Sequence, residues 1–236
     1  MTPTRLPQRS SRWHALGNEY LVVEATEFSA ADARALVGDA DGVVQIVAAA
    51  YDTVDVAIWN RDGSTAEMSG NGTRIAARWL AERTGARDVR VRVGAREVPS
   101  RMRADGSVEQ DVGAVVVGAP ERVAGVLVRP VSVGNPHAVV EGDPADVTRL
   151  GPLLEAHARF PDRTNVQVVR VDGPGDVTAR VWERGVGETS ASGTSAVAVA
   201  AATHDDGEVV VHFPGGDLRV RLENGRAILI GPAEAR

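Results

Sequence analysis

Two serine–glycine turns carry the residue types and spacing that could do chemistry in this chain. The first is Met68–Arg74 (MSGNGTR) and the second is Ser192–Ser195 (SGTS). Ser69 and Ser192 suit the N-cap position, and a helical pattern follows each turn. A helix start directs unpaired N–H groups and the positive end of the helix dipole at one point, which suits a carboxylate or a phosphate. Simple helix capping is the alternative explanation of each serine.

The same features recur in both halves of the chain. Leu16–Asn18 (LGN) precedes the first turn and Val133–Asn135 (VGN) precedes the second. This repeat predicts two similar lobes whose helix N-termini face one shared cleft. The 236 residues are enough for two domains of ordinary size. We place the N-terminal lobe at 1–120 and the C-terminal lobe at 121–226, and the last strand, near 227–236, is a candidate to return to the N-terminal lobe.

Composition narrows the classes of partner. The net charge is −6 with acidic and basic residues well mixed and no basic stripe, which disfavours a nucleic-acid partner. The chain has no apolar run of membrane-spanning length, and residues 1–9 are polar, so we expect a frayed N-terminus, no membrane partner and a cytoplasmic location. The absence of cysteine excludes disulfides, thiolate metal sites and thiol catalysis. The histidines lack metal-site spacing.

The elements around the turns indicate the fold class. The first helix ends at Gly85, and its apolar face is formed by Ile75, Ala76, Trp79 and Leu80, with Arg74, Arg78 and Arg83 largely off that face. The second helix, 196–203, is almost wholly Ala and Val, which is typical of a buried helix. Residues 43–49 fit a strand or a helix, and 148–159 fits a short helix. Many short strands with one central helix per lobe predict an α+β fold, with a barrel-like, mostly antiparallel sheet around each helix.

The two turns and their surroundings resemble the diaminopimelate epimerase family. Residues 67–74 (EMSGNGTR) are similar to the family's first catalytic motif, and 183–194 (ERGVGETSASGT) are similar to its second. Supporting blocks are 14–18, 133–139, 164–166 and 231–233. The resemblance implies two pseudo-symmetric lobes and a two-base isomerase that needs no pyridoxal phosphate, other cofactor or metal. In the family, one cysteine removes the α-proton of an amino acid and a second cysteine protonates the opposite face.

The resemblance also implies site residues, carried over position by position. Ser69 and Ser192 stand where the family has its catalytic cysteines, and Glu183 and His137 match positions beside them. The implied substrate contacts are Asn18, Gln45, Asn60, Gly70, Asn71, Asn135, Asn165, Arg184, Gly193 and Thr194. The implied partner is a small molecule with an α-carboxylate, and the resemblance is compatible with a homodimer.

Serine in place of both thiols leaves three interpretations open. A thiol titrates near ~8.5, and lower at a helix N-terminus, whereas a serine hydroxyl needs a neighbouring base to activate it. The first interpretation is a diverged, cofactor-independent isomerase of a small amino-acid-like substrate, and this is the one we expect. The others are a ligand-binding homologue without catalysis, and a different isomerisation or cyclisation that uses Glu183 and His137.

Overall fold

The computed structural model describes residues 9–66 and 68–236, which form two compact units. Unit 1 contains the chain up to Gln110 together with Gly231–Arg236, and unit 2 is Asp111–Ile230. The lobe limits predicted from the sequence, 1–120 and 121–226, stay predictions. Two sequence predictions lie outside the described residues: the frayed N-terminus, apart from Arg9, and the first residue of the first motif, Glu67.

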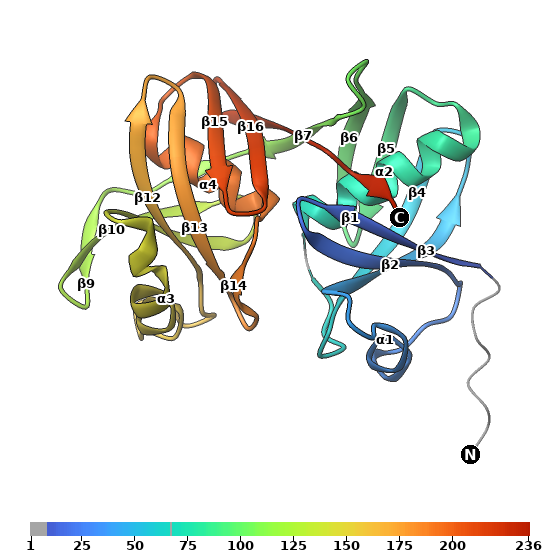
Figure 1. The fold of residues 1–236 in the computed structure, drawn as a ribbon, viewed down its shortest axis with the longest axis horizontal. Helices are drawn as coiled ribbons and strands as arrows, with labels where there is room; N and C mark the ends of the chain where they lie inside the picture. The colour runs from blue at the N-terminus through green and yellow to red at the C-terminus, as the bar shows by residue number, and fades with distance from the viewer. Residues whose placement is uncertain (1–8, 67) are drawn as a thin grey trace. The chain divides into compact units, whose positions relative to one another are not determined.

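Unit 1 is one rolled sheet with a helix inside it (Figure 1). Its strands are β1 (Ser10–Ala15), β2 (Asn18–Glu24), β3 (Gly42–Ala49), β4 (Thr53–Asn60), β5 (Asp88–Val93), β6 (Arg96–Met102), β7 (Val108–Ala114), which continues into unit 2, and β18 (Glu234–Ala235). They pair in the order β18-β1-β2-β3-β4-β5-β6-β7, parallel at β2–β3 and β4–β5 and antiparallel elsewhere. The helix α2 (Gly70–Thr84) contacts β1 to β6 and β18, so it is the centre of this unit. A short helix, α1 (Ala30–Leu36), lies between β2 and β3 in sequence.

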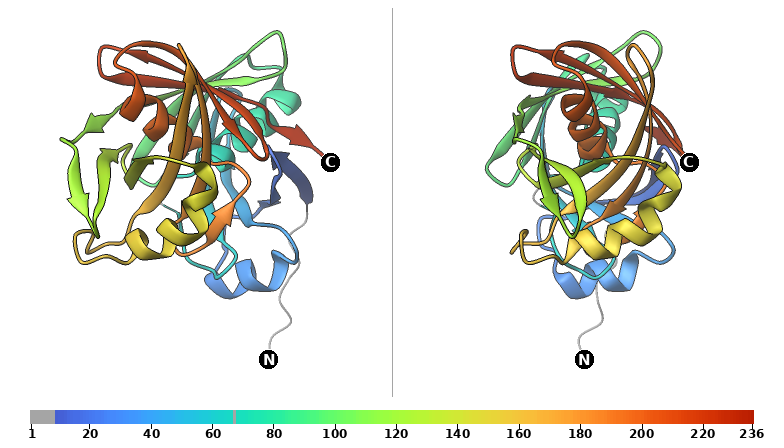
Figure 2. Two further views of the ribbon diagram at one scale, coloured as in Figure 1. Left: turned by 60° about the vertical axis from the view of Figure 1, so that its left-hand side comes forward. Right: turned by 90° about the vertical axis from the view of Figure 1, so that its left-hand side faces the viewer.

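Unit 2 repeats this plan. Its strands are β8 (Val116–Val117), β9 (Glu121–Val123), β10 (Val126–Ser132), β11 (Pro136–Glu141), β12 (Asn165–Gly173), β13 (Asp176–Glu183), β14 (Gly187–Thr189), β15 (Gly207–Phe213), β16 (Gly216–Glu223) and β17 (Arg226–Gly231). The main order is β8-β10-β11-β12-β13-β15-β16-β17, parallel at β11–β12 and β13–β15. The 3-10 helix η1 (Pro144–Asp146) and α3 (Val147–Glu155) lie between β11 and β12, in the place that α1 has in unit 1. The central helix is α4 (Gly193–Thr203), which contacts β10 to β13, β15 and β16, as the further views show (Figure 2).

The two pairing orders are the same, strand for strand, so the repeat seen in the sequence is a repeat of topology. Each unit is completed by a short strand that follows the last long strand of the other repeat. β8 follows β7 and pairs with β10, whereas β18 follows β17 and pairs with β1. The fold is therefore mixed α+β with two pseudo-symmetric lobes.

The central helices α2 and α4 differ in which residues they bury. Ser69 is the N-cap of α2, and Gly85, in the left-handed conformation at φ 76°, ends it as predicted. Arg74, which the periodicity placed off the apolar face, is nevertheless fully buried, because residues 70–77 of α2 are all buried. The prediction for α4 is confirmed: it is buried from Gly193 to Ala200.

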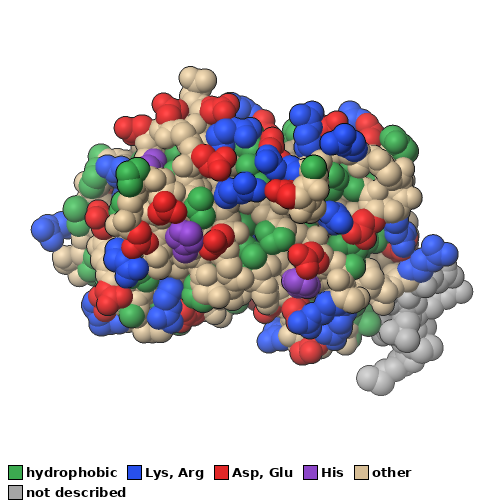
Figure 3. Space-filling view, turned by 45° about the horizontal axis from the view of Figure 1, so that its top comes forward, with side chains coloured by type: hydrophobic (Ala, Val, Ile, Leu, Met, Phe, Trp, Pro, Cys, Tyr) green, Lys and Arg blue, Asp and Glu red, His purple; other side chains and the backbone are tan. Residues whose placement is uncertain are grey.

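The sequence left some elements ambiguous or unseen. Residues 43–49 form strand β3, which is buried at its first half because the strand passes through the core of unit 1. Strand β6 was not predicted; it contains Pro99, a residue that removes a ladder hydrogen bond and argues against a strand. None of the helices in the described part of the chain is long and apolar enough to cross a membrane. On the face drawn in Figure 3, acidic and basic side chains are intermixed.

Candidate active site

The first turn places Ser69 at the start of α2. Its backbone is extended, and its Oγ accepts a hydrogen bond from the N–H of Gly72 at 3.1 Å. The first intrahelical bond runs from the N–H of Thr73 to the Ser69 carbonyl at 2.9 Å. The N–H groups of Gly70 and Asn71 therefore lie in the first turn, where a helix offers them no carbonyl. This geometry can hold one anionic oxygen beside the serine hydroxyl.

Tyr20, which the sequence analysis did not select, reaches this turn from β2. Its hydroxyl oxygen lies 3.3 Å from Oγ of Ser69. The ring has room because β3 places Gly42 opposite it: a Cβ added at Gly42 would lie 2.8 Å from Cε1 of Tyr20 and 2.6 Å from the carbonyl oxygen of Trp59. A phenol and a serine hydroxyl are thus held together at the helix start.

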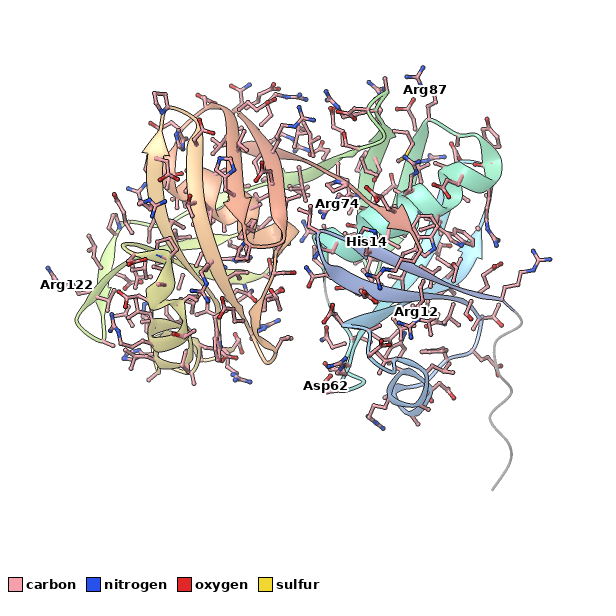
Figure 4. The ribbon with its side chains drawn as sticks, viewed as in Figure 1. Arg12, His14, Asp62, Arg74, Arg87 and Arg122 are labelled. Carbon is pink, nitrogen blue, oxygen red and sulfur yellow. The ribbon has the colours of Figure 1, made fainter. Side chains whose placement is uncertain are left out.

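Arg74 lies one turn along α2, fully buried beneath the same turn (labelled in Figure 4). Its guanidinium donates to the carbonyl of Gly70 at 2.9 Å, to Oδ1 of Asn71 at 2.7 Å and to the carbonyl of Pro232 at 3.3 Å. These acceptors are uncharged, and burial lowers the pKa of Arg74 to about 10. The group stays charged at neutral pH, so unit 1 has a positive charge under its helix start. The contact with Pro232 also explains why the block 231–233 accompanies the first motif.

The second turn has the same backbone but a different hydrogen-bond state. Ser192 is extended at φ −144° and is the N-cap of α4, with the Ala196 N–H donating to its carbonyl at 2.9 Å. Its hydroxyl makes no capping hydrogen bond within the described residues. Simple side-chain capping therefore explains Ser69 and does not explain Ser192. Ser192 and Thr194 are 4% and 5% exposed, so the second turn is also more enclosed.

A buried polar network lies behind the second turn. His137 bonds through Nε2 to Oδ1 of Asn135 and through Nδ1 to Nε2 of Gln167, each at 3.0 Å. Gln167 also donates to Oγ of Ser195 at 2.9 Å, and Asn135 donates to Oγ1 of Thr194 at 3.4 Å. The network therefore joins β11 and β12 to the first turn of α4. Oε1 of Gln167 is buried without a partner among the described residues.

This network decides the state of His137. Its side chain is buried, and desolvation lowers its pKa to about 3, so the imidazole is neutral at neutral pH. Both ring nitrogens are occupied by protein groups, which leaves neither a lone pair nor a proton for a substrate. The geometry argues against a direct acid–base role for His137 and supports a role in orienting Asn135.

The loop of the second motif is held by Asn165 and by Glu155. The amide of Asn165 accepts from the N–H of Arg184 at 3.0 Å and donates to the carbonyl of Pro136 at 2.9 Å. Glu155, at the end of α3 and only 5% exposed, accepts from Nε1 of Trp182 at 2.8 Å and from the N–H of Gly185 at 2.6 Å. Glu155 also pairs with Arg163 at 2.6 Å. The loop conformation is thus fixed from two sides.

The remaining residues that the resemblance assigned to the site are distributed over both units. Glu183 accepts from Oγ1 of Thr189 at 2.6 Å, and Arg184 donates to the carbonyl of Asp162 at 3.2 Å. In unit 1, Asn60 donates to Oγ of Ser64 at 2.9 Å, and Asn18 is buried. Gln45 is buried with both amide ends used, donating to the carbonyl of Ala25 and accepting from Nε1 of Trp59.

The structure groups these residues into two clusters, one in each unit. The cluster of unit 1 contains Tyr20, Ser69, Gly70, Asn71 and Arg74. The cluster of unit 2 contains Asn135, Ser192, Gly193 and Thr194, supported by His137 and by the 183–187 loop. No group of three or more His, Cys, Asp or Glu in the described ranges is arranged to hold a metal ion.

Comparison with known proteins identifies the family. The family model for diaminopimelate epimerase matches residues 12–118 and 130–235. The chain belongs to the diaminopimelate epimerase family. A curated diaminopimelate epimerase from Desulforudis audaxviator is 36% identical over 268 aligned positions, which cover 95% of each protein. The family is one of isomerases, so this chain is an isomerase by family.

Solved structures with low sequence identity share the fold. The structure of a predicted epimerase from Pseudomonas aeruginosa superposes with a TM-score of 0.72 at 17% identity, covering 97% of this chain and 96% of that one. A hydroxyproline epimerase from Agrobacterium vitis, solved with bound trans-4-hydroxy-L-proline, gives a TM-score of 0.67 at 13% identity, covering 96% of this chain and 88% of that one. The diaminopimelate epimerase family fold is thus shared with these two proteins.

Two signals in the sequence could have found the residues that were missed. Tyr20 stands two positions after Asn18, just as His137 stands two positions after Asn135. The Gly-Asn repeat therefore makes Tyr20 the counterpart of His137 and a candidate site residue. Trp59-Asn60 and Trp182-Glu183 are a second repeated pair, and each indole N–H donates to a buried side-chain oxygen. Those oxygens belong to Gln45 and Glu155, which therefore hold equivalent strands in the two units.

Proposed function

We propose that this chain is a cofactor-independent isomerase that moves the α-proton of a small amino-acid-like substrate. The α-carboxylate of its ligand is bound by N–H groups of a serine-led helix start, the element that α2 and α4 each provide. The observation that carries this proposal is the duplicated serine-led helix start in a chain of the diaminopimelate epimerase family. Ser69 and Ser192 occupy the places of the family's two thiols.

The physical basis is the charge that grows during proton removal. Taking the α-proton leaves an electron pair that spreads onto the carboxylate, so oxygen charge increases in the transition state. Preorganised N–H groups that already face the carboxylate stabilise that added charge. Arg74 adds a positive charge below the first turn. The binding half of the reaction is therefore supported more directly than the proton transfer.

A ligand-binding protein without catalysis is the second candidate. It is favoured by one fact: no thiol is present anywhere in the chain. The third interpretation, a reaction run by Glu183 and His137, is disfavoured because His137 is neutral, buried and hydrogen-bonded at both nitrogens.

Exchange in deuterated water separates these candidates. The full-length protein is incubated with diaminopimelate and with a panel of other amino acids, and deuterium at Cα is followed by mass spectrometry. If each protein molecule exchanges the α-proton of many substrate molecules, the isomerase is supported. Binding by calorimetry without exchange supports the ligand-binding protein.

The carboxylate assignment has its own test. Each amino acid that binds is compared with the matching decarboxylated amine. We expect the amine to bind at least about tenfold more weakly, because a charge-assisted hydrogen bond of roughly 1.5–3 kcal/mol is lost. Amines that bind as tightly as the acids would rule the assignment out.

A further inference from the structure

The unexplained part of the proposed function is the base in unit 1, because an isolated serine hydroxyl does not remove a carbon-bound proton at useful rates. We propose that Tyr20 is the proton acceptor that acts through Ser69, with the buried charge of Arg74 favouring the phenolate. This inference rests on the proposed function for its reaction, and on the geometry of unit 1 for the residues.

The first step of the argument is the contact between the two hydroxyl groups. Oγ of Ser69 accepts from the Gly72 N–H at 3.1 Å, and the Tyr20 oxygen lies 3.3 Å from the same Oγ. Because the Gly72 N–H already donates to Oγ of Ser69, the hydroxyl proton of Ser69 can point towards the Tyr20 oxygen. The chain also makes space for this contact, since any side chain at position 42 would displace the ring.

The second step is electrostatic. Arg74 is fully buried, its hydrogen bonds to the described residues go to uncharged acceptors, and its charge interacts with Tyr20. A cation near the N-terminus of a helix adds to the positive end of the dipole and is itself disfavoured there. An anion at Tyr20 or Ser69 relieves both effects. From α2 the charged group acting on Tyr20 is Arg74, and the strands on either side place uncharged Trp13 and Gly42 opposite it.

The proton transfer balances without a further reactant. The phenolate oxygen of Tyr20 takes the hydroxyl proton of Ser69 while Oγ of Ser69 takes the α-proton of the substrate. One O–H bond forms at Tyr20 and one at Ser69, and the old Ser69 O–H bond and the substrate Cα–H bond break. The electron pair of the C–H bond remains on the substrate as the enolate of its carboxylate. Serine is never a free alkoxide.

A spectroscopic titration tests the ionisation without any substrate. The chain has two tyrosines, and Tyr51 is 66% exposed, so Tyr51→Phe leaves Tyr20 as the single phenol and Tyr20→Phe leaves Tyr51. The ultraviolet absorbance of phenolate is followed against pH in both variants. We expect Tyr20 to titrate at a lower pH than Tyr51, since an opposite charge nearby favours the charged form of a phenol. Equal or reversed midpoints would overturn the proposal.

Variants of Arg74 test the cause. In the Tyr51→Phe background, Arg74→Met should raise the Tyr20 midpoint towards about 10, the ordinary value for a phenol, and Arg74→Lys should keep it low. Arg78→Met is the matched control, because Arg78 lies on the same helix and is paired with Glu82 at 2.8 Å. If Arg74→Met does not fold, the comparison of the two single-tyrosine variants still decides the ionisation. If the Tyr20 midpoint is the same with and without Arg74→Met, the charge of Arg74 does not favour the phenolate.

Exchange kinetics test the relay itself. Tyr20→Phe should lower α-deuterium uptake by about 10²-fold or more, Tyr51→Phe should not change it, and the rate should rise with pH at the Tyr20 midpoint. Because the two groups act as one unit, Tyr20→Phe with Ser69→Ala should be no slower than either change alone. Exchange that survives Tyr20→Phe overturns the relay and leaves the proposed function standing. If the parent protein shows no exchange but Tyr20 still titrates at a lowered pH, the proposed function fails and the ionisation of Tyr20 is still supported.

Discussion

The two helix starts have the same backbone and different side chains around it. At α2 the serine hydroxyl is hydrogen-bonded to Gly72 and approached by Tyr20, and Arg74 brings a buried positive charge. At α4 the serine hydroxyl makes no capping bond in the described structure, the helix is apolar, and the buried His137 behind the turn is neutral. Both units keep the serine-led helix start, while the side chains around it differ between them.

This difference matters for a reaction that needs a base on one side and an acid on the other. Identical turns would give two groups of equal pKa, and neither direction of transfer would be preferred. The buried charge of Arg74 below α2 favours a deprotonated group there, and the low exposure of Ser192 at α4 favours the protonated, uncharged form. The comparison therefore predicts that the two positions respond differently to the same substitution.

The largest expected effect comes from restoring both thiols. The double change Ser69→Cys with Ser192→Cys should raise α-deuterium uptake by about 10²- to 10⁴-fold, because a positioned group that ionises near neutrality contributes that much. Either single change should do less, since the opposite face still lacks its own acid. A double variant that binds ligand and exchanges no faster than the parent would mean that the site has diverged beyond the two serines.

The single cysteine variants measure the asymmetry directly. The pH dependence of alkylation gives the pKa of each thiol in an otherwise cysteine-free chain. We expect the thiol at position 69 to have the lower pKa, because Arg74 and the Gly72 N–H both favour its thiolate. Equal values would break the comparison between the two turns.

The next effect is an acid sensitivity that belongs to unit 2. The folded-state pKa of His137 is about 3 against 6.5 for a free imidazole, owing to burial. Its contribution to stability is complete above about pH 6.5 and is lost as pH falls towards 3, by up to about 1.4 kcal/mol per pH unit. Urea unfolding at a series of pH values should show a shallower acid loss in His137→Gln than in the parent.

His212 is the control for this measurement. It lies between Asp217 and Asp176, and the hydrogen bond that its Nδ1–H donates to Asp217 is the main reason that its pKa is raised. Its contribution is present below about 6.5 and is lost as pH rises through the higher folded value, which is the opposite direction. The group is 37% exposed, so the effect is well under 1 kcal/mol. An acid slope that is unchanged in His137→Gln would contradict the buried neutral state.

The third effect concerns the loop that carries the second motif. Glu155→Gln replaces an acceptor by a donor beside the Trp182 and Gly185 N–H groups, which should destabilise the protein by about 1–3 kcal/mol. Equilibrium unfolding measures this loss, and ligand affinity should fall with it because the 183–187 loop is no longer fixed. Glu223→Gln, at an ion pair with a 62% exposed carboxylate, is the matched control and should have almost no effect. Equal losses in both variants would mean that Glu155 does not hold the loop.

Much of the fold could be predicted because its signals are local. Serine caps, Gly85 in the left-handed region and alternating Val residues each specify a local backbone state, and the Gly-Asn and Ser-Gly repeats indicated two lobes. Strand β6 escaped because Pro99 is tolerated there by tertiary context, which no local rule registers. Family resemblance then supplied the arrangement of the strands.

The candidate site was predicted in its positions and missed in its electrostatics. Ser69, Ser192 and the asparagines follow from motif spacing. The burial of Arg74 and the approach of Tyr20 depend on contacts between segments distant in sequence, namely Pro232 with α2 and Gly42 with β2. Helical periodicity placed Arg74 off the apolar face, where a charged residue ordinarily lies, and among the described residues three uncharged acceptors help to make its burial tolerable.

The smallest effect discriminates best between the two turns, because it removes only a hydroxyl from each. Ser69→Ala deletes the acceptor for the Gly72 N–H and should destabilise the protein by about 1 kcal/mol, the usual value of an N-cap. Ser192→Ala deletes a hydroxyl that makes no capping bond in the described structure, so its free energy of unfolding should stay within a few tenths of a kcal/mol of the parent. Equilibrium denaturation of the parent and both variants under one set of conditions gives the comparison.

Ser→Gly at each position is the companion change, since glycine is also a good N-cap residue and should restore most of the stability lost at position 69. Equal losses at both positions would show that Ser192 caps its helix in solution, and the two turns would then be alike in structure. A loss at 69 alone would leave the hydroxyl of Ser192 without a structural role and available for a ligand.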